Sequence, residues 1–138
     1  MVVMVSSCSW AGFVSVATRD AYIRIAPDEN SNEVANVTKY YPLYVMAQAG
    51  EWYQVRGWMG EEGWIMATQV SPSRSLVVKK IKVSLRSGPG SGYRNVTPLF
   101  KGYIVKVLER KGPWFKVMLV DPPDGTEGWV HSSLVWGN

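Results

Sequence analysis

The sequence has too little cysteine and histidine for most metal-dependent or covalent chemistry. A single cysteine, Cys8, excludes an internal disulfide and a thiolate metal cluster, and a single histidine, His131, excludes a site built from several histidines. Cys8 and His131 lie near opposite ends of the chain, and neither is surrounded by the signature of a catalytic nucleophile or base. We therefore predict no metal site, no cofactor and no catalytic residue.

Long apolar runs and the usual enzyme motifs are also missing. No stretch reaches the roughly 20 apolar residues that are needed to cross a bilayer, and apolar residues never recur at helical spacing. The glycine-rich segment 88–92 is followed by no Gly-Lys-Ser/Thr and no expected helix, so it indicates a turn and not a phosphate loop. Because paired-carboxylate motifs are absent too, we predict that the protein is not an enzyme.

What the sequence does contain is aromatic residues and short alternating segments. Seven Trp and seven Tyr are many for 138 residues, and such large side chains help a small barrel to bury enough area. Apolar and polar residues alternate at 43–47, 52–56, 104–108 and 114–119, which predicts strands. Segments rich in Gly, Pro, Asn and Asp at 27–30, 49–50, 88–92 and 122–125 predict turns. The pattern favours an all-β barrel or sandwich.

The same pattern occurs twice. A shift of 62 positions aligns Arg24 with Arg86, and GEWYQV at 50–55 with GPWFKV at 112–117. Beyond three extra residues in the turn at 121–125, a shift of 65 aligns EGWI at 62–65 with EGWV at 127–130. The match extends through about fifty residues with one gap, which predicts a duplicated module.

The duplication suggests how the chain is divided. We predict a leader or N-terminal arm at 1–12, a first barrel at 13–70, a linker at 71–75 and a second barrel at 76–138. Each copy is close to the smallest size that folds independently. The linker is too short to let the copies move far from each other.

The repeated segments resemble the bacterial Src homology 3-like (SH3-like, SH3b) domain family. The second copy matches with LRSGPG at 85–90, KGYIVKVL at 101–108, GPWFKV at 112–117 and GWVHSSLV at 128–135. The first copy matches more loosely, with IRIAP at 23–27, GEWYQV at 50–55 and GWIMATQV at 63–70, and it has Ala26 and Tyr40 where the second copy has Gly88 and Gly102. The resemblance covers roughly residues 13–136. It implies two tandem small SH3-like β-barrels of about five strands each.

The resemblance also implies a function. Members of the family are non-catalytic accessory modules, usually exported and often associated with the cell envelope. We therefore expect this chain to recognise cell-wall peptide, glycan or a protein partner. The groove with which eukaryotic relatives bind proline-rich peptides is not implied, because the acidic, tyrosine-rich first-loop motif and the closing Pro-Ser-Asn-Tyr are both missing.

The phase of the strands suggests where a ligand binds. In each strand the apolar residues, Tyr53 and Val55 or Phe115 and Val117, share one face. Trp52 and Trp114 fall on the opposite, polar face, where an aromatic residue is a candidate binding platform. The alternative is that each Trp folds over a barrel end or packs between the copies. We expect Arg24 and Arg86 to fix the loop before the Pro turn rather than to contact a ligand. The candidate ligand-binding residues are Trp114, Trp129, Lys116, Trp52, Trp64 and Tyr93.

Charge differs between the two copies. Four cations and seven anions give residues 16–70 a net charge of −3, whereas eleven cations and four anions give residues 74–138 a net charge of +7. Such a split suits a structural adaptor that docks between unlike partners in a larger assembly. The basic second copy also suits an anionic polymer, and nucleic acid is the less favoured example of one.

The first residues offer one modification site. The segment Val5-Ser6-Ser7-Cys8 resembles the end of a lipoprotein signal, in which Cys8 is lipidated. This interpretation requires an upstream start codon, because residues 1–7 contain no basic region and are too short for an apolar signal core. We expect contact with a membrane only through such a lipid anchor and place the protein in the periplasm or envelope. The alternative is an unprocessed arm with a buried thiol, on a cytoplasmic protein.

Overall fold

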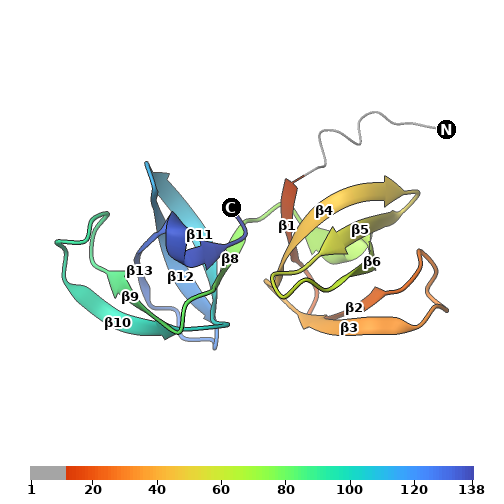
Figure 1. Ribbon diagram of the computed structural model, residues 1–138, viewed down its shortest axis with the longest axis horizontal. Helices are drawn as coiled ribbons and strands as arrows, with labels where there is room; N and C mark the ends of the chain where they lie inside the picture. Colours follow the sequence, from red (N-terminus) through yellow and green to blue (C-terminus); the bar gives the residue numbers. More distant parts are fainter. Residues whose placement is uncertain (1–11) are drawn as a thin grey trace. The chain divides into compact units, whose positions relative to one another are not determined.

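The computed structural model describes residues 12–138, which form β-strands, turns and two short 3₁₀ helices (Figure 1). The chain divides into two compact units between Pro72 and Ser73. We call these the first unit and the second unit. None of the helices in the described part is long and apolar enough to span a membrane. The prediction of an all-β chain with two small β domains is confirmed.

The first unit is one antiparallel sheet that curves around its own core. Its strands are β1 (Gly12–Val16), β2 (Asp20–Arg24), β3 (Glu33–Thr38), β4 (Pro42–Ala49), β5 (Trp52–Arg56), β6 (Glu62–Met66) and β7 (Val70–Ser71), with the 3₁₀ helix η1 (Ala67–Gln69) before β7. The strand order is β3-β2-β6-β5-β4-β1-β7. Because β1 pairs with both β4 and β7, it ties the start of the unit to its end.

The second unit repeats this topology. Its strands are β8 (Ser75–Val78), β9 (Lys82–Arg86), β10 (Asn95–Phe100), β11 (Ile104–Lys111), β12 (Trp114–Asp121), β13 (Glu127–His131) and β14 (Val135–Trp136), with η2 (Ser132–Leu134) before β14. The order β10-β9-β13-β12-β11-β8-β14 is that of the first unit, strand for strand. Each sheet has seven strands, more than the five or so expected. Part of the excess is the two-residue strands β7 and β14, which carry too little pattern to be predicted.

Alternation along the strands separates core from surface. Tyr53 and Val55 of β5 are buried, and so are Phe115, Val117 and Leu119 of β12, which confirms the predicted core faces. The intervening residues of both strands face outward and are half-buried or exposed. Each unit therefore has its own apolar core and an outer sheet face on which a ligand could bind.

A glycine brings two strands together in each unit. If Gly63 of β6 carried a Cβ, that atom would lie 2.5 Å from the carbonyl oxygen of Arg24 on β2. At Gly128 of β13 a Cβ would lie 2.8 Å from the equivalent oxygen of Arg86 on β9. Only glycine allows so close an approach. The glycine of each Gly-Trp pair therefore sets how closely the arginine-bearing strand approaches the strand that carries the tryptophan.

The first copy keeps the backbone of the second copy even where its sequence departs. Tyr40 has a φ of 76°, in the left-handed region, and Gly102 at the equivalent position has a φ of 91°. The amide of Tyr40 donates to Val16 O over 2.8 Å, and that of Gly102 donates to Val78 O over the same distance. The loose family match at Tyr40 thus changes the side chain but not the turn.

Candidate functional site

The outer sheet face of each unit carries a row of matched residues. In the first unit Trp52 lies opposite Met66, and Trp64 lies opposite Arg24 on its other side. The second unit has Trp114 opposite His131, and Trp129 opposite Arg86. Residues opposite each other in an antiparallel pair lie on the same face. On the outer face of each unit, tryptophan and arginine are therefore neighbours of a third residue, which is Met66 in the first unit and His131 in the second.

A groove lies at the same place in both units. The first-copy groove has a volume of about 330 Å³ and is lined by Tyr22, Arg24, Glu29, Trp52, Met66 and Gln69. The second-copy groove has a volume of about 410 Å³ and is lined by Lys82, Val83, Ser84, Arg86, Ser91, Trp114, His131, Ser133 and Leu134. All six positions of the first-copy groove have their equivalents in the second. The groove is thus a property of the module, and only its chemistry differs between copies.

One arginine in each groove is held by the adjacent loop. Arg24 donates from Nη1 to Ser31 O over 2.9 Å, and Arg86 donates from Nη1 to Tyr93 O over 3.2 Å. Ser31 and Tyr93 are themselves equivalent positions. The arginines therefore fix the loop as predicted, but at a point after the Pro turn and not before it. The same side chains also line the grooves, a role that the sequence interpretation had set aside.

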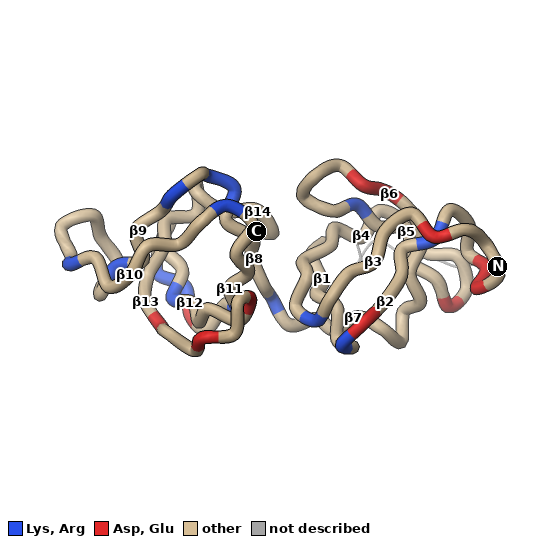
Figure 2. The backbone as a smooth tube through the Cα atoms, turned by 90° about the horizontal axis from the view of Figure 1, so that it is seen from below, with Lys and Arg blue, Asp and Glu red and all other residues tan. Residues whose placement is uncertain are grey.

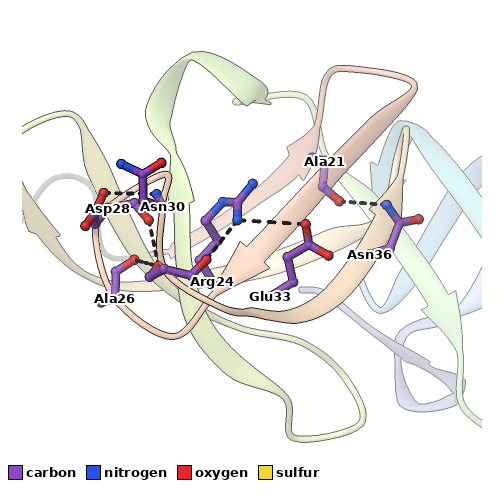
Figure 3. A network of polar contacts seen from close by, with 8 residues as sticks. Ala21, Arg24, Ala26, Asp28, Asn30, Glu33 and Asn36 are labelled. Atoms are coloured by element: carbon purple, nitrogen blue, oxygen red, sulfur yellow. Dashed lines mark hydrogen bonds and ion pairs between the residues drawn. The ribbon is translucent and has the colours of Figure 1, made fainter.

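The two grooves differ in their acidic residues. A carboxylate oxygen of Glu33 lies 3.8 Å from Nη1 of Arg24 (Figure 3), and Glu29 lines the same groove. The second copy has Asn95 and Ser91 at these two positions. Within the described part of the chain, no carboxylate lies within ion-pair distance of Arg86. Arg24 is therefore partly neutralised by its own loop, whereas Arg86 is not.

The remaining charges strengthen this contrast. Lys82 lines the second-copy groove at the position that Asp20 occupies in the first copy. The sequence contains no acidic residue between Glu62 and Glu109. Figure 2 marks acidic residues in red, and those of the second unit lie on β11, β12, β13 and the turn before β13. The second-copy groove is consequently lined by two cationic side chains, Lys82 and Arg86, and by no acidic one.

His131 adds a polar ring to the second-copy groove. Its ring meets that of Trp114 edge to face, with 5.1 Å between centroids and 89° between planes. Nδ1 of His131 accepts a hydrogen bond from the amide of Ser133 over 3.1 Å. Nδ1 also lies 2.8 Å from Oγ of Ser133. In the tautomer whose Nδ1 accepts from the amide, Nε2 carries the proton and can donate to a ligand. The first copy has Met66 here and offers no such donor.

The predicted binding residues fall into two groups. Trp52 and Trp114 line the grooves. Trp64, Trp129 and Lys116 lie in the adjoining row of the sheet: Trp64 lies opposite Gln54, and Lys116 opposite Trp129. Trp129 is only 8% exposed, and Nζ of Lys111 lies 6.0 Å from its ring centroid.

Tyr93 is the exposed loop residue whose carbonyl accepts from Arg86, and its ring covers Gly88, where a Cβ would meet the ring. The proposed lipidation site, Cys8, lies outside the described residues. Across residues 12–138, no group of three or more His, Cys, Asp or Glu side chains is placed to hold a metal ion.

Apart from Trp52 and Trp114, the groove residues were not among the predicted candidate ligand-binding residues. Lys82 and Arg86 were predicted as part of the basic surface of the second copy, and Arg86, which is repeated in both copies, also as a residue that fixes the loop. His131 could have been found from the register of the β12–β13 hairpin, which pairs it with Trp114. That register depends on how the inserted turn at 121–125 is accommodated.

Comparison with models of known protein families shows the kind of module. Two family models, each described as a bacterial SH3 domain, match residues 17–72 and 82–135. The chain is also similar to the putative N-acetylmuramoyl-L-alanine amidase YrvJ of Bacillus subtilis (strain 168), with 25% identity over 135 residues that make up 90% of this chain and 25% of the relative. The chain therefore spans about a quarter of that curated relative.

Solved structures with partial similarity include three proteins. NlpC2 from Trichomonas vaginalis is 12% identical, with a TM-score of 0.40, over 94% of this chain and 49% of its own. An NlpC/P60 family protein from Bacillus cereus ATCC 10987 is 14% identical, with a TM-score of 0.39, over 90% and 55%. The CBD of endolysin LysPBC5 is 16% identical, with a TM-score of 0.35, over 91% and 92%. The chain spans about half of the first two.

Proposed function

We propose that this chain, which consists of two bacterial SH3 domains in tandem, is a non-catalytic module that binds the bacterial cell wall. The two matches confirm the family and the tandem arrangement that the repeated motifs predicted. Support for the wall as ligand comes from the curated relative, whose name describes an amidase acting on N-acetylmuramoyl-L-alanine. In this proposal the wall component is a peptide or glycan, and the active site of any hydrolase lies elsewhere.

The observation that carries this proposal is the repeated groove. A tryptophan and an arginine at equivalent positions line a groove in each unit, and both of these residues lie on the outer face of the sheet. An indole offers a large, rigid contact area, and the neighbouring polar groups can orient a ligand. Of the two, we assign binding mainly to the second-copy groove, because it is larger and is lined by His131 and Lys82 in addition.

A place in the envelope follows from binding the wall. We propose an extracytoplasmic location and lipidation of Cys8 as the tether. The intact mass of the natively expressed protein tests the tether, because lipidation adds the mass of its acyl chains to a polypeptide that begins at Cys8. An unmodified Cys8 on a chain that begins at Met1 would contradict it.

Sedimentation with purified peptidoglycan tests the function. We expect the wild-type chain to sediment with the sacculi, Trp114→Ala to remain largely in the supernatant, and Trp52→Ala to lose less. Leu108→Ala is the matched control, because Leu108 is an exposed apolar residue of the same unit, 43% exposed, and lines neither groove. Thermal unfolding of each variant establishes that it is folded. Wild-type protein that stays in the supernatant would overturn the proposal.

One specific observation favours a second candidate, binding of an anionic polymer. Ile81 is 81% exposed and stands between Lys80 and Lys82, close to Lys79, in a stretch that has no carboxylate. Binding to either polymer should weaken as the salt concentration rises. Direct competition between peptidoglycan and single-stranded DNA for the chain therefore distinguishes the two. An adaptor within a larger assembly remains the third candidate, and a monodisperse free monomer in cell extract would contradict it.

A further inference from the structure

The side chains that line the second-copy groove carry N–H groups that can donate hydrogen bonds to a ligand. A guanidinium carries five N–H groups, and one nitrogen of Arg86, Nη1, donates to Tyr93 O. His131 and Lys82 line the same groove, and an imidazole Nε2–H and an ammonium group are both hydrogen-bond donors. No carboxylate of the described residues lines this groove. A ligand that enters it therefore meets several donors and no competing internal anion.

The rest of the lining limits what that ligand can be. Leu134, which is half-buried, supplies aliphatic surface, and Trp114 supplies an indole wall. A ligand that contacts both the donors and the apolar side chains of the groove carries an anionic group next to a short apolar side chain. A peptide with a free carboxylate has this combination, whereas a polyol phosphate chain offers the charge without the apolar part. The volume of about 410 Å³ is at the small end for ligand sites, which suits a chain terminus or a single side-chain carboxylate.

The first-copy groove has the same arrangement of residues, but acidic side chains partly neutralise the charge of its arginine. It retains the equivalent arginine and tryptophan but adds Glu29 to the lining, and Glu33 lies 3.8 Å from Arg24. Met66 replaces the histidine, and Asp20 takes the position of Lys82. A carboxylate ligand would there approach two acids next to the one arginine. The carboxylates of the groove would repel a carboxylate ligand that binds next to them. The first-copy groove is therefore a natural comparison in which we expect the ligand not to bind.

We propose that the second-copy groove is a receptor for a peptide carboxylate, with Arg86, Lys82 and Nε2 of His131 as its donors and Trp114 as the apolar wall. The first-copy groove does not bind this group. The inference rests on the proposed function only for the source of the peptide, which would be the wall. The carboxylate preference itself stands on the groove.

The direct test is an NMR titration of the ¹⁵N-labelled full chain with small probes. The probes are N-acetyl-alanyl-alanine with a free carboxylate, in its L and D forms, its C-terminal amide, and glycerol phosphate. We expect at least one free-acid form to shift the amides of β9, β13 and the 87–94 loop, and the amide form to bind at least about tenfold more weakly. The equivalent signals of β2 and β6 should not move.

Two substitutions place the site. Ser91→Glu installs the acid of the first copy and should weaken binding of the free acid at least about tenfold while leaving the fold intact, because Ser91 is exposed. Lys82→Gln should weaken binding severalfold. Asn138→Asp, which adds one negative charge at an exposed position outside the groove, is the control and should bind like wild type.

Each outcome decides a separate claim. Equal binding of acid and amide, absence of binding by both, or tighter binding of glycerol phosphate than of either acid would overturn the carboxylate receptor, even if the chain sediments with peptidoglycan. Free-acid binding that is lost in Ser91→Glu supports the receptor, even if peptidoglycan is not bound. In that second case the proposed function fails and the inference stands.

Discussion

Replacing Gly128 with alanine should destabilise the second unit through a single added methyl group. A Cβ at this position would lie 2.6 Å from Cγ of Leu85 and 2.8 Å from the carbonyl oxygen of Arg86. Leu85 is fully buried and the oxygen belongs to the backbone of β9, so neither can move aside freely. Overpacking of a tightly packed core costs about 1–3 kcal/mol. For a unit of this size each kcal/mol lowers the melting temperature by about 4–8 °C.

Scanning calorimetry of the full chain measures this effect, with NMR to assign each transition to its unit. Gly92→Ala is the control, because a Cβ there meets nothing within 4 Å and the residue is exposed. We expect the control to unfold within about 0.5 kcal/mol of wild type. If Gly128→Ala is as stable as Gly92→Ala, the close approach of β13 and β9 is not the reason for the glycine.

Three further predictions concern the first unit. Gly63→Ala should cost a similar 1–3 kcal/mol there, because its Cβ would lie 2.5 Å from Arg24 O; calorimetry checks it, and an unchanged first-unit transition contradicts it. Burial and the carboxylate of Glu61, 2.6 Å from the Tyr41 hydroxyl, raise the pKa of Tyr41 above its usual value. The resulting stabilisation is present below about pH 10, the pKa in the unfolded chain, and is lost as pH rises further. Tyr41→Phe should therefore lower the free energy of unfolding by about 1 kcal/mol at pH 7 and should reduce the loss of stability above about pH 10. Urea unfolding at pH 7 and above pH 10 measures both effects, and a pH dependence equal to that of wild type would refute the prediction. Deleting residues 1–17 removes β1, which pairs with β4 and β7, so NMR should show the first unit unfolded and the second intact; a folded first unit would be the contrary result.

The fold could be predicted because its signals are local and are repeated. Alternation at Trp52–Arg56 and Trp114–Leu119 defines the core face without knowledge of the partner strands. The aligned Gly-Trp pairs define the duplication. The fold of the first copy could be predicted although Tyr40 departs from the family pattern, because Tyr40 adopts the same left-handed conformation as Gly102.

The groove could be predicted only in part, because its residues come from segments far apart in sequence. Strand phase selected Trp114, but the side chains that complete the groove come from β9, the 87–94 loop and the end of β13. The contact of His131 with Trp114 depends on the register across an inserted turn. Arg86 was predicted to fix the loop and to add to the basic surface of the second copy, but not to line a groove, because a side chain that fixes backbone and a side chain that lines a groove give the same sequence signal.

The central claim is that the second-copy groove attaches this chain to the cell wall. The most direct measurement is the dissociation constant for purified peptidoglycan of the wild-type chain and the Trp114→Ala and Leu108→Ala variants, all shown to be folded. We expect Leu108→Ala to bind like wild type and Trp114→Ala to bind at least about tenfold more weakly. Equal binding by all three proteins would contradict the assignment of the groove, and no binding by wild type would contradict the function itself.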